Sequence, residues 1–280
     1  MNESGQALRA TLANRGQLSF IGVYDVFSSV VASKHFDGIF VSGFSFAASH
    51  YGLPDVGFIA WPDIVAFTRR VRTVLPDAHI LVDIDDGYGD PEIAAHVVAS
   101  LEEVGASGVI LDDQLRPRKC GHLGGKLLQD LDICLDKLQR VLAARRSLFV
   151  VARTDAAEPE EMERRALAMA AAGADAILID GLSDLETVRS VRAKTPIPIA
   201  FNQIAGGRSP GRSWSELKEA GVSMVIYSTP CLFAAQAALD RELESLRDAD
   251  GVLPEPGDGR VSLGECTSLL DESLARRHGR

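Results

Sequence analysis

Residues 80–91 read ILVDIDDGYGDP, and this stretch decides the fold. An apolar run without polar alternation is typical of a strand whose two faces are both buried in a parallel sheet. The run ends in acidic residues and a Gly-rich turn, after which Pro91 opens an amphipathic stretch. Proline suits the first turn of a helix. The stretch therefore predicts one strand–turn–helix unit with acidic side chains at the carboxyl end of its strand.

The same unit recurs along the chain. Apolar runs that we expect to be strands cover residues 19–25, 38–43, 80–85, 108–114, 148–155, 176–181, 197–203 and 224–229. Helical patterns cover 62–75, 91–104, 159–172, 184–194 and 213–220. Eight strands alternating with helices predict an α/β protein with a closed (β/α)8 TIM barrel. The alternative is an open doubly wound sheet, which the absence of GxGxxG after the first strand disfavours.

The two ends of the sequence extend this barrel. Residues 1–17 are expected to form an N-terminal helix, and residues 230–248 the last barrel helix. The domain 1–248 is thus the predicted (β/α)8 barrel. Residues 249–260 are rich in Pro and Gly and read as a linker. With a helix expected at 262–276, residues 249–280 form a C-terminal helical extension that packs on the barrel or on a neighbouring subunit.

Composition excludes several classes of partner. The 280 residues carry a formal net charge of −10, which argues against nucleic acid. No run of about 18 apolar residues is present, so no membrane span is expected. The N-terminal sequence lacks the pattern of a secretory signal. The cysteines form no CxxC pair, which favours reduced thiols in a cytoplasmic protein. They are Cys120, Cys134, Cys231 and Cys266.

The carboxyl ends of the predicted strands carry a cluster of aspartates. Asp83 and Asp85 are two apart on one strand, so both side chains should face the same side. Asp112 ends the next strand and can complete the group. Oxygen ligands without His or Cys favour a hard cation such as Mg²⁺. The alternative is that these are solvated loop acids or helix N-caps.

Basic residues accompany the aspartates. Arg153 ends the fifth predicted strand, and its fork suits a substrate carboxylate, although a structural ion pair is the alternative. The segment 114–126, QLRPRKCGHLGGK, is long and Gly-rich for a loop of this kind, as lids often are. Cations at 118, 119 and 122 should lower the pKa of Cys120 if they stay close. The alternative is a mobile basic loop with an incidental cysteine.

Several short motifs occur in a specific order. Asp83-x-Asp-x-Gly-Tyr-Gly is followed by Asp112-Asp-Gln, by Lys119-Cys-Gly-His and by Arg153-Thr-Asp. Tyr-Asp at 24–25, Ser-Gly at 42–43 and Gly-Gly-Arg-Ser-Pro at 206–210 accompany them. In this combination the chain resembles the isocitrate lyase/phosphoenolpyruvate mutase superfamily over roughly residues 18–235.

The resemblance implies a (β/α)8 barrel that binds Mg²⁺, or sometimes Mn²⁺. It also implies a homotetramer of dimers that exchange their last helix. The substrate would be a small 2-hydroxy or 2-oxo acid that reacts through an enolate. The implied metal ligands are Asp83, Asp85 and Asp112. The implied substrate-binding residues are Ser42, Gly43, Phe44, Asp83, Arg153, Asp180 and Asn202. The implied catalytic residues are Cys120, Tyr24, His122 and Lys119.

The Lys-Cys-Gly-His loop resembles that of the carbon–carbon lyases, in which the cysteine protonates the departing fragment. It implies a lyase for a substituted malate or methylisocitrate-like acid. The alternative is a phosphonomutase, or a hydrolase of phosphonopyruvate- or oxaloacetate-like acids. A non-catalytic barrel is the third reading. The chain departs from the family pattern at Asp112 and Asp180, where Glu is usual, and at Asp86, where a small or neutral residue is common.

Overall fold

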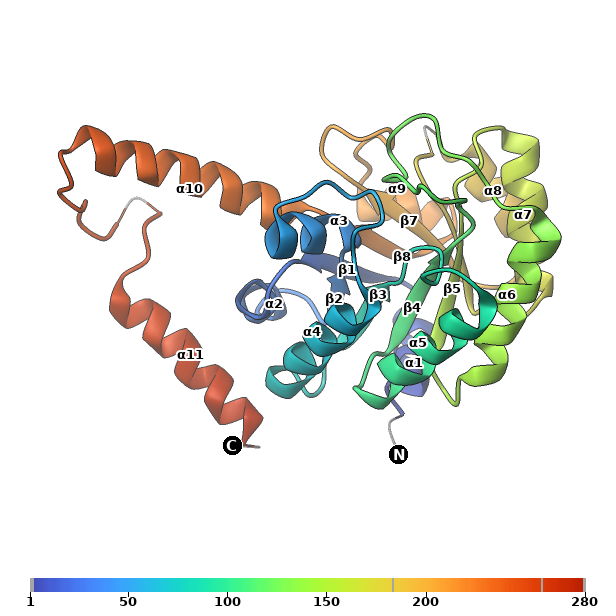
Figure 1. Ribbon diagram of the computed structural model, residues 1–280, viewed down its shortest axis with the longest axis horizontal. Coiled ribbons are helices and arrows are strands. Elements are labelled where there is room, and N and C mark those ends of the chain that lie inside the picture. Colours follow the sequence, from blue (N-terminus) through green and yellow to red (C-terminus); the bar gives the residue numbers. More distant parts are fainter. Residues whose placement is uncertain (1–2, 183, 258, 279–280) are drawn as a thin grey trace.

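The computed structural model describes residues 3–182, 184–257 and 259–278. Eight parallel strands pair in sequence order, and β1 pairs with β8, so the sheet closes (Figure 1). The predicted (β/α)8 barrel is confirmed. The strands are β1 (Leu18–Val23), β2 (Gly38–Val41), β3 (His79–Asp83), β4 (Gly108–Asp112), β5 (Phe149–Thr154), β6 (Ala176–Ile179), β7 (Ile199–Gln203) and β8 (Val222–Tyr227).

Helices surround the sheet (Figure 1). They are α1 (Ser4–Arg15), α2 (Val26–Ser33), α3 (Gly43–Phe46), the π-helix η1 (Ala47–Tyr51), α4 (Trp61–Val74), α5 (Pro91–Glu103), α6 (Leu131–Ala144), α7 (Pro159–Ala171), α8 (Glu186–Lys194), α9 (Trp214–Glu219), α10 (Pro230–Asp248) and α11 (Leu263–Arg277). The predicted helices are found within three residues of their expected ends, whereas α2, α3, η1 and α6 were not predicted. Positions 1–2, 258 and 279–280 of the predicted terminal segments lie outside the described residues.

Two apolar cores hold the barrel together. The larger core fills the space between the strands and the surrounding helices. The smaller one fills the barrel interior, where Phe20, Phe40 and Phe149 meet Leu8 and Leu12 of α1. Helix α1 therefore closes the amino-terminal end of the barrel. The opposite end, where the strands finish, is left to polar side chains.

Polar anchors also fix the amino-terminal end. Glu102, at the end of α5, accepts hydrogen bonds from the backbone N–H groups of Arg146, Ser147 and Leu148, just before β5. Burial raises the pKa of Glu102, but these hydrogen bonds outweigh it and leave the pKa below its ordinary value. Three backbone donors on one carboxylate fix the end of α5 to the residues before β5.

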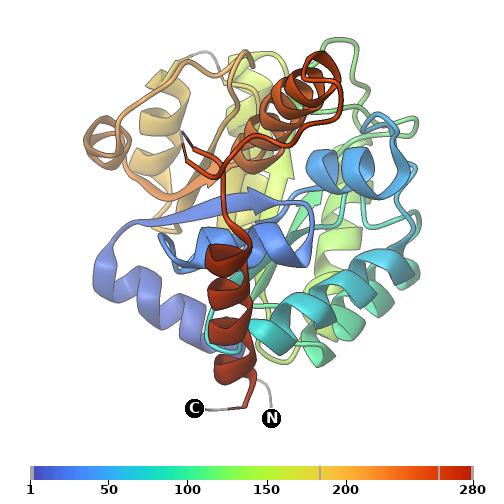
Figure 2. The same cartoon turned by 90° about the vertical axis from the view of Figure 1, so that its left-hand side faces the viewer.

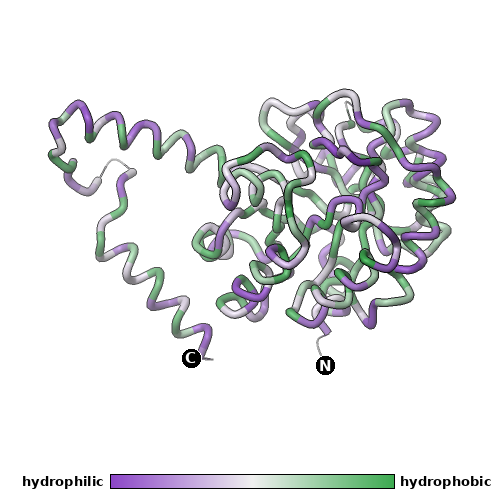
Figure 3. Tube along the Cα trace, viewed as in Figure 1, coloured by the Kyte–Doolittle hydropathy of each residue, from purple (hydrophilic) through white to green (hydrophobic). Residues whose placement is uncertain are grey.

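The last two helices depart from the barrel outline. Helix α10 extends away from the barrel and α11 runs back along its outside (Figures 1 and 2). No residue of α10 is buried, whereas α11 contacts α4. Apolar and polar residues alternate along both helices (Figure 3). Among the described helices, none is long and apolar enough to cross a membrane.

Candidate active site

The carboxyl end of β3 brings two aspartates together beside Gly43. The strand ends at Asp83, and the chain turns at Asp85, whose φ is 52°. A Cβ on Gly43 would lie 3.0 Å from Asp83 Oδ2 and 3.5 Å from Asp85 Oδ1, so a larger residue would require the Asp83 carboxylate to shift. The prediction that both aspartates lie on the strand was wrong. They converge because the left-handed turn at Asp85, which Asp tolerates, folds its carboxylate back.

A buried arginine lies among four carboxylates, which we call the acidic cluster: Asp55, Asp83, Asp85 and Asp112. The Arg118 side chain is fully buried. Its Nη1 contacts Asp55 and lies 3.1 Å from Asp85 Oδ1, while Nη2 lies 3.3 Å from Asp112 Oδ2. Asp55 and Arg118 were not among the predicted site residues. For Asp55 the only signal was its Gly/Pro-rich loop, which follows β2 and η1.

The structure directs Arg118, and not Lys119, into the acidic cluster. The Lys119 backbone is held by the Gln114 amide, which donates to its carbonyl and accepts from its N–H, both at 2.8 Å. The Lys119 ammonium lies near Gly125, since a Cβ there would be 3.1 Å away. The two neighbouring cations therefore have different surroundings, Arg118 among carboxylates and Lys119 beside Gly125. The placement therefore gives no support to the predicted catalytic role of Lys119.

One guanidinium cannot neutralise the whole cluster. Burial raises the pKa of Asp83 to about 6, despite the opposing charge of Arg118. Burial likewise raises the pKa of Asp85 well above its ordinary value, and that of Asp112 above its own, again against Arg118. Buried carboxylates with raised pKa values favour either a proton or a further cation. The cluster is therefore electrostatically prepared to receive positive charge.

The donor set of the cluster suits Mg²⁺. Neither carboxylate oxygen of the buried Asp85 accepts a hydrogen bond, and only Oδ1 has an ion-pair contact, with Arg118. Over the described part of the chain, no three Cys, His, Asp or Glu side chains form a ready-made metal cage. Mg²⁺ does not need one, because it commonly keeps several waters and takes one or two carboxylates. The unpartnered Oδ2 of Asp85 therefore fits a hard cation, with Asp83 and Asp112 as direct or water-mediated partners.

Arg153, at the end of β5, is held by two carboxylates. Its Nε and Nη2 donate to the two oxygens of Asp155 at 2.9 and 3.0 Å. Nη2 also lies 2.8 Å from Asp180 Oδ2. Burial raises the pKa of Asp155, but the Arg153 charge outweighs it and lowers the pKa. The structure thus shows Arg153 in ion pairs, which was the alternative to a role in substrate binding. Binding of a substrate carboxylate by Arg153 stays a prediction.

A chain of hydrogen bonds joins the ends of β6, β7 and β8. Ser228 Oγ donates to Asn202 Oδ1 at 2.8 Å, and Asn202 Nδ2 donates to Asp180 Oδ1 at 3.1 Å. His122 Nε2 lies 3.3 Å from the same oxygen. Burial raises the pKa of Asp180, but Arg153 and the hydrogen bonds from His122 and Asn202 outweigh it and hold the pKa well below its ordinary value. Asp180 is therefore an ionised acceptor.

The loop between β4 and α6 covers this network, and we call residues 114–129 the lid. Lys126 Nζ donates to the Gly121 carbonyl and to Asp155 Oδ1, the latter at 2.8 Å. A Cβ on Gly121 would lie only 2.0 Å from Asp180 Oδ2. The lid therefore lies directly on the Arg153 ion pairs, and Gly121 is the residue that permits this. The predicted lid is brought to the predicted site.

The prediction that cations lower the pKa of Cys120 was wrong. Burial raises the pKa of the Cys120 thiol to about 11, and Asp180 adds to the effect, while a backbone hydrogen bond at His122 offsets only part. The expected cation, Arg118, is turned into the acidic cluster instead. At neutral pH Cys120 is therefore a protonated thiol, which can act as an acid.

This protonation state predicts slow alkylation. Iodoacetamide reacts with the thiolate, and a pKa of about 11 leaves only about one thiol in a thousand ionised at pH 8. We expect Cys120 to react about 100-fold more slowly in the folded chain than in urea, with the rate rising through pH 10. Peptide mass spectrometry separates it from Cys134, Cys231 and Cys266. Rapid labelling of Cys120 at pH 7 would show that the thiol is activated after all.

Three other predicted residues lie around the rim. Ser42 is buried and caps α3, accepting from the Ser45 N–H at 3.3 Å. Phe44 packs edge-to-face against Phe233 of α10, with ring centroids 6.2 Å apart. The Tyr24 side chain lines an apolar groove on the side of α2 and α10, and burial raises its pKa, with Asp25 adding to the shift. The structure therefore groups Tyr24 and Phe44 with α10 rather than with the acidic cluster.

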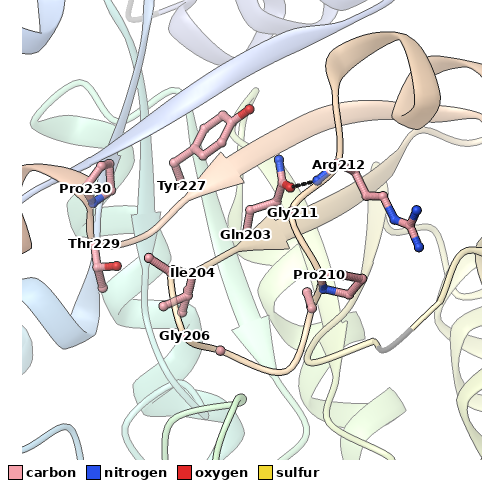
Figure 4. A pocket seen from close by; sticks show the side chains of 12 residues that line it. Gln203, Ile204, Gly206, Pro210, Gly211, Arg212, Tyr227, Thr229 and Pro230 are labelled. Atoms are coloured by element: carbon pink, nitrogen blue, oxygen red, sulfur yellow. Dashed lines mark hydrogen bonds between the residues drawn. The ribbon is translucent and has the colours of Figure 1, made fainter.

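A cavity adjoins the His122 side of the site. Its volume is about 560 Å³, and the loop after β7 and the end of β8 line it. Ile204, Tyr227 and Pro230 give it an apolar wall, and Gln203 Oε1 accepts from the Arg212 N–H at 2.6 Å (Figure 4). Its size is in the range of small-molecule sites.

The chain matches the family model of phosphoenolpyruvate phosphomutase over residues 8–247. The chain belongs to the PEP mutase/isocitrate lyase superfamily. It is 34% identical over 268 residues to the petal death protein of Dianthus caryophyllus, with 92% of this chain and 83% of that protein covered. It is 31% identical over 251 residues to 2-methylisocitrate lyase of Shewanella oneidensis, with 87% and 85% covered.

Solved structures of the superfamily share the whole fold. A 2,3-dimethylmalate lyase matches with a TM-score of 0.90 and 30% identity, covering 99% of this chain and 95% of that one. An oxaloacetate acetylhydrolase bound to 3,3-difluorooxalacetate matches with a TM-score of 0.90 and 29% identity, covering 99% and 97%. A phosphonopyruvate hydrolase bound to oxalate and Mg²⁺ matches with a TM-score of 0.84 and 25% identity, covering 99% and 98%. The prediction of an enzyme from this superfamily, related to its lyases, is confirmed.

Proposed function

We propose that the chain is a Mg²⁺-dependent carbon–carbon lyase that cleaves a substituted malate or a methylisocitrate-like 2-hydroxy acid. The observation that carries the proposal is the protonated Cys120 thiol on a lid that lies on the Arg153 ion pairs. A lyase of this type needs an acid to protonate the departing carbanion-like fragment. The similarity to 2-methylisocitrate and 2,3-dimethylmalate lyases supports the same chemistry.

The residues divide the work in a simple way. Asp83, Asp85 and Asp112 would hold Mg²⁺, which supplies a Lewis acid for the oxygen that becomes a carbonyl. Arg153 would hold the substrate carboxylate, because Asp155 and Asp180 fix the plane of its guanidinium. The cavity beside Ile204 and Tyr227 would accept the substituent.

Cys120 would then give its proton to the departing carbon. A thiol with a pKa of about 11 keeps its proton until a stronger base forms beside it. The lid excludes water from the fragment, because Gly121 lies against Asp180 and Lys126 ties the lid to Asp155. The departing fragment is thereby protonated at carbon by the protein and not by solvent.

A substrate panel tests the proposal. The purified chain with Mg²⁺ is incubated with substituted malates, methylisocitrate, oxaloacetate and phosphonopyruvate, and released oxo acids are followed by coupled reduction. Conversion of a 2-hydroxy acid to a 2-oxo acid and a second carboxylate supports the lyase. Exclusive hydrolysis of oxaloacetate, or phosphate release seen by ³¹P NMR, would replace it by the hydrolase or phosphonate alternative.

We also propose a homotetramer in which α10 and α11 contact a neighbouring copy. Leu239 and Leu243 of α10 are more than half exposed, as is Leu274 of α11. Apolar side chains on a helix that the barrel leaves uncovered suit a protein contact. Light scattering should give four times the 30.0 kDa of one chain. Leu239→Asp combined with Leu243→Asp should reduce this mass, and an unchanged tetramer would place the interface elsewhere.

A further inference from the structure

The segment that follows β7 contacts the lid at the side chain of His122. A Cβ built on Gly207 would lie 2.4 Å from His122 Nδ1, which is closer than any real contact. The next residue, Arg208, donates its backbone N–H to the same Nδ1 at 3.0 Å. The imidazole therefore lies in a space that exists only because residue 207 lacks a side chain, and it is bound there by a main-chain donor.

This contact determines where the imidazole carries its proton. A backbone N–H can donate only, so His122 Nδ1 must present a lone pair and cannot be protonated. The proton of the neutral ring is then on Nε2, which lies 3.3 Å from Asp180 Oδ1. Asn202 Nδ2 donates to the same Asp180 oxygen at 3.1 Å. Asn202 Nδ2 and His122 Nε2 are 3.4 Å apart, as two donors that share one acceptor.

We propose that Gly207 and the Arg208 N–H form a seat that fixes the lid by holding His122 as the neutral Nε2–H tautomer. Neither residue acts on the substrate, so both are positioning residues. The seat works through His122, whose two nitrogens join the loop after β7 to Asp180 at the end of β6.

The seat also affects Arg153. Asp180 accepts from His122 through Oδ1 and binds Arg153 through Oδ2 at 2.8 Å. Gly121, the lid residue before His122, would clash with both partners if it carried a Cβ, at 2.0 Å from Asp180 and 2.4 Å from Arg153. A lid that leaves its seat therefore uncovers this ion pair and removes one donor from Asp180. Lid position and the orientation of Arg153 are thereby coupled.

Two matched glycine variants test the seat. Gly207→Ala places a methyl group where the imidazole lies and 3.1 Å from the Ile204 carbonyl oxygen, while the φ of residue 207, outside the left-handed region, is one that alanine adopts. Gly211→Ala, in the same loop, meets nothing within 4 Å and also has an ordinary φ. Both residues line the same cavity. Only Gly207→Ala should disturb His122.

The first measurement is made on the wild-type chain. ¹⁵N NMR of histidine side chains at pH 8, with His122→Gln identifying the signal, should show an unprotonated Nδ1 and a protonated Nε2 in the wild-type chain. The second measurement is the alkylation rate of Cys120. It should rise at least tenfold in Gly207→Ala and stay at the wild-type value in Gly211→Ala, with equal circular dichroism in all three.

Two results would overturn the seat. An Nδ1–H tautomer in the wild-type chain contradicts the hydrogen bond from Arg208, and this holds even if Gly207→Ala does not fold. A folded Gly207→Ala with wild-type alkylation and an unchanged His122 signal would show that the lid does not depend on residue 207. Both results are independent of which substrate the enzyme uses.

Discussion

Replacing Cys120 with serine will lower turnover by about 10²–10⁴-fold, the range expected when a positioned proton donor is lost. A serine hydroxyl holds its proton much more strongly than a thiol, so it cannot protonate the departing carbon in time. Binding should change little, because the Arg153 ion pairs and the acidic cluster do not contain the thiol. The measurement is kcat and KM with the substrate that the panel identifies.

Cys266→Ser is the matched control for this experiment. Cys266 is a free, partly exposed thiol on α11, outside the site. Its replacement should leave kcat unchanged. Near-wild-type turnover in Cys120→Ser would exclude the thiol as the acid, and a rise in KM at constant kcat would make Cys120 a binding residue instead.

Asp85→Asn will abolish Mg²⁺ binding without destabilising the metal-free chain. The raised pKa of Asp85 means that its ionised form is less favourable in the folded than in the unfolded chain at neutral pH. A neutral amide removes this cost, and Asn tolerates a φ of 52°. At 100 times its Kd, Mg²⁺ should stabilise the wild type by about 2.7 kcal/mol and the variant by nothing. Thermal unfolding with and without Mg²⁺ measures both effects.

The adjacent residue provides the control. Asp86 accepts two hydrogen bonds from Arg116, at 2.9 and 2.7 Å, and is not part of the acidic cluster. Asp86→Asn should lose about 1 kcal/mol of stability and keep its response to Mg²⁺. The two neighbouring variants should therefore behave in opposite ways. A Mg²⁺ response that survives in Asp85→Asn would move the metal away from this cluster.

The strand order and barrel closure could be predicted because each strand is an unbroken apolar run with its own turn and helix. These signals are local, and eight of them in alternation leave few folds. The polar residues at the strand ends could be predicted for the same reason, and they include Asp83, Asp112 and Arg153. The helix α6 was not predicted, although its apolar residues also recur at helical spacing.

The contacts inside the site could not be predicted in this way. Asp55 and Arg118 are 63 residues apart, and no local sequence pattern in either segment predicts their contact. The pKa of Cys120 was predicted in the wrong direction because sequence proximity to Arg118 says nothing about where the guanidinium points. The same applies to Asp85, where a single left-handed residue replaces the expected strand geometry.

The anchoring of Glu102 to the start of β5 lies at the end of the barrel opposite the lid and the acidic cluster. The hydrogen bonds that hold the backbone before β5 are therefore separated from the rim that carries the proposed active site. Loops can be exchanged at the rim, as in grafting the segment after β7 from a relative, while Glu102 and α1 retain the scaffold. The molecule is thus a suitable scaffold for redesigning the specificity of the proposed site.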